Sequence, residues 1–365
     1  MSLNPLQQLA ALGQSVWCDF IERRMLRNGD FARLVENDGV TGVTTNPTIF
    51  ERALAAGNDY AADVAALVSQ GAQPGRIGEA LMRQDVMQAA DLLRPVYERT
   101  GAADGYVSLE VSPRLAYDAQ ATVTQAQAAW EALARPNVMI KVPATRAGLD
   151  AIRALTRAGV NVNATLLFSV SRYLRVAQAY RQGLEARVAA GQQVDRIASV
   201  ASFFVSRIDT LIDARLATRA DSAAAQLRGQ AGIASARLAY REFERLQRDV
   251  AWLPLAASGA RPQRLLWAST STKDPGASDV RYVDALIAPL TVNTLTRETL
   301  AAYRDHGKPA LRIGLDLAQA DRLVAALAAV GIDLDAVAAE LEADGVRRFA
   351  ASEVALVSQI AQASG

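Results

Sequence analysis

The sequence of 365 residues contains one cysteine, Cys18, and one histidine, His306. A single cysteine excludes a disulfide framework within the chain, and this is typical of proteins in a reducing compartment. One cysteine and one histidine are too few for a zinc site built from these residues, and they argue against a Ser-His-Asp triad. Cys18 stands in an apolar run, so we interpret it as a buried structural thiol.

The sequence also lacks an excess of charge of either sign. Its formal net charge is +1, whereas nucleic-acid binders usually carry a basic excess or a basic stripe, so we expect no nucleic-acid partner. No apolar run reaches membrane-spanning length without charges or prolines, and the first residues lack the basic segment of a signal peptide. We therefore expect a cytoplasmic protein without a membrane partner. Small anionic substrates stay possible, because they need only a few local basic groups.

Lysine is scarce in this chain. Only Lys141, Lys273 and Lys308 are lysines among 39 basic residues. Because nearly all basic residues of this chain are arginines, each lysine is a candidate for a role that arginine cannot fill. Arginine stays protonated and cannot act as an amine nucleophile, whereas lysine can.

Short apolar runs alternate with longer amphipathic segments, of which 120–134 and 170–189 are clear examples. The eight runs that we predict as strands are Ser15–Phe20, Gly42–Thr45, Tyr106–Val111, Val138–Pro143, Asn161–Phe168, Ala198–Val205, Leu265–Thr270 and Ala285–Thr291. Strands that alternate with helices favour a parallel sheet, and eight such repeats predict an α/β fold, the (β/α)8 TIM barrel.

Two segments exceed a minimal barrel. Residues 211–253 form a helical insertion before the seventh strand, and residues 316–365 are rich in alanine and helix-prone. The second segment could cover one mouth of the barrel. No low-complexity linker divides the chain, so we expect one domain over residues 1–365.

Polar residues follow one parity of the predicted strands. Alternate residues of a strand share a face, which places Ser108 with Glu110, Asn163 with Thr165, and Lys141 opposite Ile140 and Val142. A lone polar residue in a strand usually marks a solvated face. Strands of a parallel barrel have no solvated face, so this conjunction predicts a functional cavity at the carboxyl ends of the strands.

Lys141 is the candidate nucleophile. Its place in an apolar strand disfavours the charged ammonium, and a neutral amine can attack a carbonyl to form a Schiff base. Each step of such chemistry requires a proton transfer. Asp19 and Glu110 are carboxyls at neighbouring strand ends, so they are the candidate general acids and bases. A water held by Glu110 and Thr165 could relay protons. We expect neither carboxylate to pair with Lys141 directly, because an ion pair would keep the ammonium charged.

Arg207, which follows the sixth strand, fits a substrate phosphate, although on spacing alone a surface salt bridge is an equal alternative. Lys273 follows the seventh strand and could help to hold phosphate, but an exposed loop lysine is the simpler reading. Lys308 is read as part of a surface turn.

Several motifs together resemble transaldolase, in particular its longer bacterial branch, along nearly the whole chain. They are 15–19 (SVWCD), 42–50 (GVTTNPTIF), 107–111 (VSLEV), 139–145 (MIKVPAT), 161–169 (NVNATLLFS), 202–207 (SFFVSR) and 291–294 (TVNT).

The resemblance implies a barrel enzyme of the class I aldolase type that uses neither metal nor organic cofactor. It implies transfer of a dihydroxyacetone unit from sedoheptulose 7-phosphate to glyceraldehyde 3-phosphate in the non-oxidative pentose phosphate pathway, giving erythrose 4-phosphate and fructose 6-phosphate. Partners would be sugar phosphates, and the enzyme a monomer or a homodimer.

The resemblance also implies roles for individual residues. Lys141 corresponds to the imine-forming lysine, Asp19 to the carboxylate that acts where the C–C bond breaks, and Glu110 with Thr165 to the pair that positions a water. The implied substrate-binding residues are Asn46, Asn163, Ser202, Phe204 and Arg207, the last for phosphate. Shorter transaldolases carry a second phosphate arginine after the seventh strand, where this chain has 269–274 (STSTKD) and Lys273 could substitute.

Two alternatives stay open. An aldolase that releases free dihydroxyacetone from fructose 6-phosphate would share the fold and the lysine, and the glutamate of the 107–111 motif only weakly favours the transferase. An inactive sugar-phosphate binding protein would share the barrel, but the intact set of lysine, carboxyls and threonine argues against it.

Overall fold

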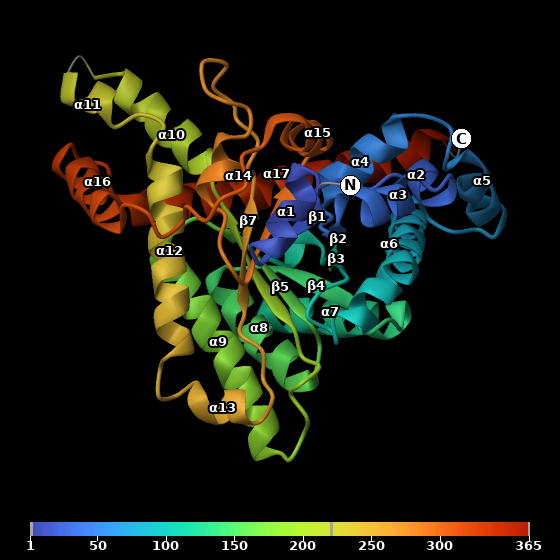
Figure 1. Cartoon of the computed structure of the whole chain (residues 1–365). Helices are drawn as coiled ribbons and strands as arrows, with labels where there is room; N and C mark the ends of the chain where they lie inside the picture. Colours follow the sequence, from blue (N-terminus) through green and yellow to red (C-terminus); the bar gives the residue numbers. More distant parts are fainter. Residues whose placement is uncertain (1–2, 220–221, 364–365) are drawn as a thin grey trace.

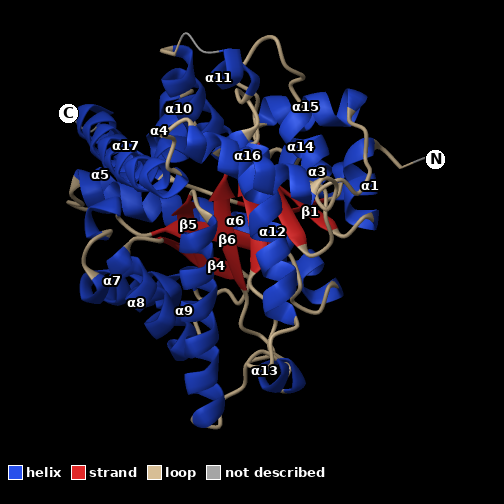
Figure 2. Ribbon diagram, turned by 90° about the vertical axis from the view of Figure 1, so that its left-hand side faces the viewer, coloured by secondary structure: helices blue, strands red, loops and turns tan. Residues whose placement is uncertain are grey.

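Eight parallel strands close into a barrel in sequence order, and helices surround it (Figures 1 and 2). The computed structural model describes residues 3–219 and 222–363. The strands are β1 Gln14–Cys18, β2 Val40–Val43, β3 Tyr106–Glu110, β4 Val138–Pro143, β5 Val162–Leu167, β6 Ser199–Phe204, β7 Arg264–Ala268 and β8 Thr291–Leu295. The predicted (β/α)8 barrel is confirmed: seven of the predicted strands largely coincide with observed ones, and the eighth shares only Thr291 with β8.

The eighth strand was predicted over Ala285–Thr291, and this is wrong. Ala285 ends helix α14 (Arg281–Ala285), and β8 begins only at Thr291. The apolar run between them is a loop, because Pro289 has no N–H to donate to a ladder and Leu290 is left-handed with φ of 56°. The loop is nevertheless buried at Leu286, Ile287 and Ala288, and a side chain satisfies one of its carbonyl groups, because Gln14 Nε2 donates to Leu286 O at 2.8 Å.

The helices occupy the connections between strands. Those before β4 are α1 Pro5–Ala11, α2 Arg23–Arg27, α3 Asp30–Asp38, α4 Pro47–Ala55, α5 Ala61–Ser69, α6 Pro74–Arg99, the 3₁₀ helix η1 Pro113–Leu115 and α7 Ala119–Leu133. Those between β4 and β8 are α8 Arg146–Ala158, α9 Val170–Ala189, α10 Ser206–Ala217, α11 Ser222–Gln226, α12 Ala231–Gln247, α13 Leu253–Ala257 and α14. After β8 come α15 Arg297–His306, α16 Leu317–Ala329 and α17 Leu334–Ala363.

The two segments beyond a minimal barrel lie side by side in part. Within 211–253 the chain is divided among the end of α10, α11 and α12, with residues 220–221 outside the described part. Helix α12 packs against α9 and α16. Helix α17 crosses the upper end of the barrel (Figure 1) and contacts α4, α6, α10 and β5, so it lies over the carboxyl ends of the strands.

The opposite end of the barrel is closed by a polar cluster beneath a tryptophan. Trp17 is fully buried, and its Nε1 donates to Asp104 Oδ1 at 2.8 Å. Thr41 Oγ1 donates to Asp104 Oδ2 at 2.8 Å. The indole lies against Gly42 of the neighbouring strand, where an added Cβ would stand 2.4 Å from the ring. The packing of the barrel floor therefore requires glycine at position 42.

Substituting Gly42→Ala should lower the free energy of unfolding by about 1–3 kcal/mol, because the methyl group must displace a buried indole. Chemical denaturation followed by far-UV circular dichroism measures this. Gly75→Ala in α6, which meets nothing within 4 Å, is the matched control and should change stability by less than about 1 kcal/mol. Equal effects of the two substitutions would contradict the packing argument.

Candidate functional site

Lys141 lies at the centre of the barrel mouth. All six residues of β4 are buried, and the side chain of Lys141 is 4% exposed. The strand register aligns it with Glu110 of β3 and Asn163 of β5. Its Nζ donates to the carbonyl of Thr45 at 3.0 Å, and the ring centroid of Phe349 from α17 lies 5.6 Å away. The amine is thus held on several sides within the barrel.

Glu110 contacts Lys141 directly. Its Oε2 lies 3.2 Å from Nζ in a pair that is almost fully buried, so the expectation that no carboxylate pairs with this lysine is wrong. The register places the two residues side by side on adjacent strands with both side chains inward, and this separation leaves no room for an intervening water. Neither oxygen of Glu110 has a hydrogen-bond partner among the described residues, so the contact is an ion pair without hydrogen-bond alignment.

Burial raises the pKa of Glu110 to about 6, against the attraction of Lys141, which lowers it. Burial also raises the pKa of Asp19, and the attraction of Lys141 and a hydrogen bond from Thr44 oppose this shift. Thr44 Oγ1 donates to Asp19 Oδ1 at 3.0 Å and lies 2.7 Å from Thr294 Oγ1. Both carboxyls therefore hold their protons more tightly than exposed ones, which suits groups that exchange protons near neutral pH.

A hydrogen-bonded row crosses the barrel next to the lysine. Asn163 Nδ2 donates to Ser108 Oγ at 2.9 Å, and Ser202 Oγ donates to Asn163 Oδ1 at 2.7 Å. Thr165 is fully buried, and its hydroxyl has no partner within the part of the chain that the structure describes. Leu166, which follows it, has φ of 62° and interrupts the register of β5 with β6.

A cavity of about 970 Å³ opens above Lys141. The predicted residues that line it are Asp19, Asn46, Lys141, Thr165, Ser202, Phe204 and Arg207, together with Lys273. Asn163 lies beneath them in the hydrogen-bonded row, and Glu110 reaches the lysine from the side. The structure therefore brings all nine predicted site residues to one end of the barrel.

The outer part of this cavity is basic. Arg207 lies in the first turn of α10, with its guanidinium 5.2 Å from the ring centroid of Phe204. Burial and the nearby Arg348 lower the pKa of Arg207, and its Nη1 is a buried atom with no partner among the described residues. Lys273 Nζ donates to Ser271 Oγ at 2.8 Å. An anionic group that entered here would find an unused donor on Arg207.

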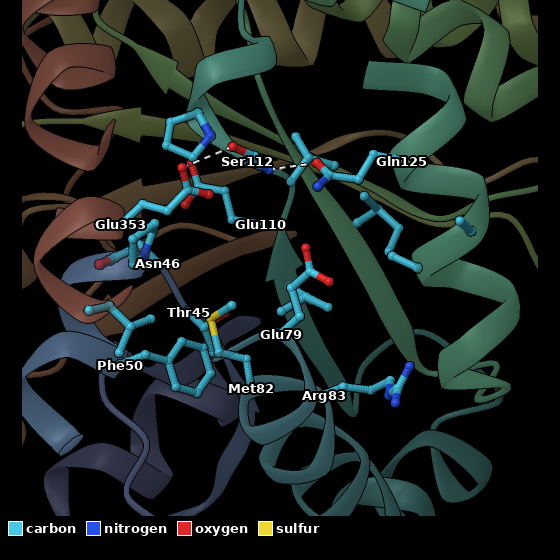
Figure 3. A pocket seen from close by; sticks show the side chains of 18 of the residues that line it. Thr45, Asn46, Phe50, Glu79, Met82, Arg83, Glu110, Ser112, Gln125 and Glu353 are labelled. Atoms are coloured by element: carbon cyan, nitrogen blue, oxygen red, sulfur yellow. Dashed lines mark hydrogen bonds between the residues drawn. The ribbon is translucent and has the colours of Figure 1, made fainter. Parts of the chain in front are cut away.

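Asn46 also has a structural bond, because its Oδ1 accepts from Ile49 N at 3.0 Å and caps α4. It lines both the main cavity and a smaller one of about 260 Å³ between α6, α7 and α17 (Figure 3). At the rim of the smaller cavity Ser112 Oγ donates to Glu353 Oε2 at 3.0 Å, and Ser112 N donates to Gln125 at 2.7 Å. These bonds tie α17 and α7 to the segment that follows β3.

The sequence analysis missed several groups that face the site. Thr294 of β8 was not predicted because the predicted eighth strand ended at Thr291. Phe349 and Arg348 were not predicted because they lie on α17, far along the chain from the strand ends that carry the other site residues. A phenylalanine at i+8 from Leu341 was the available hint, since both fall on one helix face. In the described ranges, no group of three His, Cys, Asp or Glu side chains is placed to hold a metal ion.

Fold and site together define a parallel (β/α)8 barrel protein with a buried lysine and two carboxyls at the carboxyl ends of its strands. The family model described as Transaldolase/Fructose-6-phosphate aldolase matches residues 16–360, and the chain belongs to this family.

Relatives resemble the chain along its length. A protein of Thiobacillus denitrificans named Transaldolase is 47% identical over 98% of this chain and 100% of its own length. One of Frankia alni with the same name is 47% identical over 99% and 98%, and Transaldolase 2 of a Nostoc species is 45% identical over 96% and 94%.

The raised pKa of Glu110 predicts that its carboxyl titrates with a midpoint near pH 6, as carbon-13 NMR of labelled glutamate would report. The folded protein binds this proton more tightly than the unfolded chain. The contribution of Glu110 to stability is therefore full below pH 4.5, the ordinary pKa of a glutamate, and is lost as pH rises through about 6.

Glu110→Gln should remove this transition, and Glu353→Gln, at the rim of the smaller cavity, should leave it in place. A Glu110 midpoint below 5 would show that burial does not govern this group.

Proposed function

We propose that the protein is a transaldolase that transfers a dihydroxyacetone unit from sedoheptulose 7-phosphate to glyceraldehyde 3-phosphate, through a Schiff base on Lys141. The observation that carries this proposal is the buried Lys141 amine, with Glu110 at 3.2 Å and Asp19 at the same barrel mouth. The names of the full-length relatives support the same reaction.

In the proposed mechanism the Lys141 amine attacks the ketose carbonyl and gives a carbinolamine, which loses water to form the protonated imine. Glu110 is close enough to accept the ammonium proton directly when the substrate carbonyl arrives. The ion pair is therefore the resting state, and it is lost when substrate binds. Asp19 then removes the proton of the hydroxyl next to the breaking C–C bond. The aldose phosphate leaves, and the enamine that remains attacks the aldehyde carbon of the acceptor. Water then adds to the new imine, which releases the product ketose and restores the Lys141 amine.

Thr165 and Glu110 are proposed to position the water of the imine steps. Both have buried oxygens without hydrogen-bond partners among the described residues, and a buried water needs two or more polar partners. Asn46, Asn163, Ser202 and Phe204 would hold the ketose chain. Arg207 would hold the phosphate, which its unused buried donor supports.

We propose that residues 1–365 act as one domain and that the segment 316–365 covers the barrel mouth. A large hydrophobic core with members from Leu6 to Ile360 supports this. Within the described residues no helix has the length and apolar character to span a bilayer. A cytoplasmic enzyme, monomeric or homodimeric, without metal or organic cofactor remains part of the proposal.

The second candidate is an aldolase that releases free dihydroxyacetone, since the family description names both activities. The inactive sugar-phosphate binding protein is disfavoured, because Lys141, Asp19, Glu110 and Thr165 all converge on one mouth of the barrel.

Borohydride reduction in the presence of fructose 6-phosphate should add a three-carbon mass to the peptide that contains Lys141, because the imine is reduced to a stable amine. Lys141→Ala should abolish the adduct, whereas Lys308→Ala, at an exposed lysine, should leave it unchanged. An adduct that survives Lys141→Ala would refute the assignment, and its absence in the native chain would favour the binding protein.

A coupled assay separates transfer from release. Fructose 6-phosphate alone should yield little free dihydroxyacetone, and added erythrose 4-phosphate should yield sedoheptulose 7-phosphate, because the enamine waits for an aldehyde. Rapid release of dihydroxyacetone without an acceptor would instead identify the aldolase.

A further inference from the structure

Helix α17 presents one face to the barrel mouth. Leu341, Gly345 and Phe349 recur at intervals of four residues, and all three are buried. Phe349 is 3% exposed, and it lines the cavity in which the substrate would bind. Its ring lies over Nζ of Lys141 at a centroid distance of 5.6 Å. This contact joins residues 208 positions apart and has no part in the mechanism proposed above.

The depth of α17 over the mouth is set by a close contact. A Cβ added to Gly345 would stand 2.7 Å from Cδ2 of Leu166, so glycine alone lets the helix approach the end of β5 this closely. Leu166 in turn follows Thr165 and has a left-handed backbone. Helix α17 is thus packed directly onto β5, the strand that carries the hydroxyl of Thr165.

Polar bonds fix α17 on both sides of this contact. Toward its start, Arg172 forms an ion pair with Glu342 at 3.1 Å and donates to Ala144 O at 3.0 Å. Toward its end, Ser352 bonds to Thr48 at 2.8 Å, and Glu353 accepts from Ser112 at 3.0 Å. Phe349 lies between these anchors, so its ring has a defined position over the amine.

The ring closes one side of the amine to water. Thr45 O and Glu110 occupy two other directions around Nζ, and the remaining space is the substrate cavity. A water on this side of Nζ would face the apolar ring, which offers it no ordinary hydrogen-bond partner. When Lys141 carries a planar enamine, the same ring would cover one face of it, while an acceptor enters from the cavity.

We propose that Phe349 is a positioning residue that directs the three-carbon enamine toward an acceptor aldehyde and away from release as dihydroxyacetone. This inference rests on the proposed function. Release requires the enamine carbon to gain a proton from solvent, after which water adds to the imine carbon and the lysine amine leaves. Transfer instead forms a C–C bond to the aldehyde, whose oxygen takes up the proton. A ring over the enamine restricts the first route, since it excludes the solvent that supplies the proton.

The test is the ratio of free dihydroxyacetone released to dihydroxyacetone transferred, measured in one reaction with fructose 6-phosphate and limiting erythrose 4-phosphate. Phe349→Ala opens space for water and should raise this ratio roughly tenfold. Phe349→Leu fills most of the same space with an apolar side chain and should stay within about twofold of the native ratio. The ratio does not depend on the fraction of folded enzyme, so a purely structural role would leave it unchanged.

Val337→Ala is the matched control, because it truncates another buried side chain of α17 that does not line the substrate cavity, and it should leave the ratio unchanged. Phe349→Val should raise the ratio by less than alanine does, and it serves if the alanine variant does not fold. An unchanged ratio in both the alanine and valine variants of Phe349, or an equal rise in Val337→Ala, would overturn the inference. Absence of a Lys141 adduct in the native enzyme would overturn the proposed function instead.

Discussion

The buried pair of Lys141 and Glu110 is the constraint on which the site depends. In a closed parallel barrel, residues in register on adjacent strands lie at the same height and face the same interior. A lysine and a glutamate placed there must either meet or each leave a charge unpaired away from water, which is costly. The barrel therefore fixes their contact before any substrate binds. The groups around this ion pair differ in whether their own hydrogen bonds are made within the protein.

The polar groups around the ion pair fall into two kinds, those with hydrogen-bond partners in the protein and those without. The side-chain amide of Asn163 bonds to Ser108 and to Ser202, so its position beneath the cavity is fixed. Thr165 and Arg207 keep buried atoms without partners among the described residues. Such atoms are unfavourable in a folded protein unless a ligand completes them. The unsatisfied atoms thus mark where a bound water and a substrate phosphate would make their hydrogen bonds.

Much of this site was predictable from local pattern. The two-residue period of a strand needs no tertiary information. It places Lys141 opposite apolar neighbours and puts the polar residues of β3 and β5 on one face: Ser108, Glu110, Asn163 and Thr165. The eighth strand was misplaced because Pro289 and a left-handed Leu290 interrupt an apolar run that otherwise resembles a strand. The ion pair was missed because register between β3 and β4 depends on how the whole barrel closes. Phe349 was missed because a helix residue reveals its partner only once the helix is placed.

The order of these elements along the chain separates two events in the assembly of the protein. The last barrel strand, β8, ends at Leu295, whereas Gly345 and Phe349 follow some fifty residues later in α17. A chain emerging from the ribosome has therefore synthesised all eight strands before the residues that cover the lysine exist. During that interval the amine lacks the ring that closes one of its sides, and docking of α17 then restricts access to the substrate cavity.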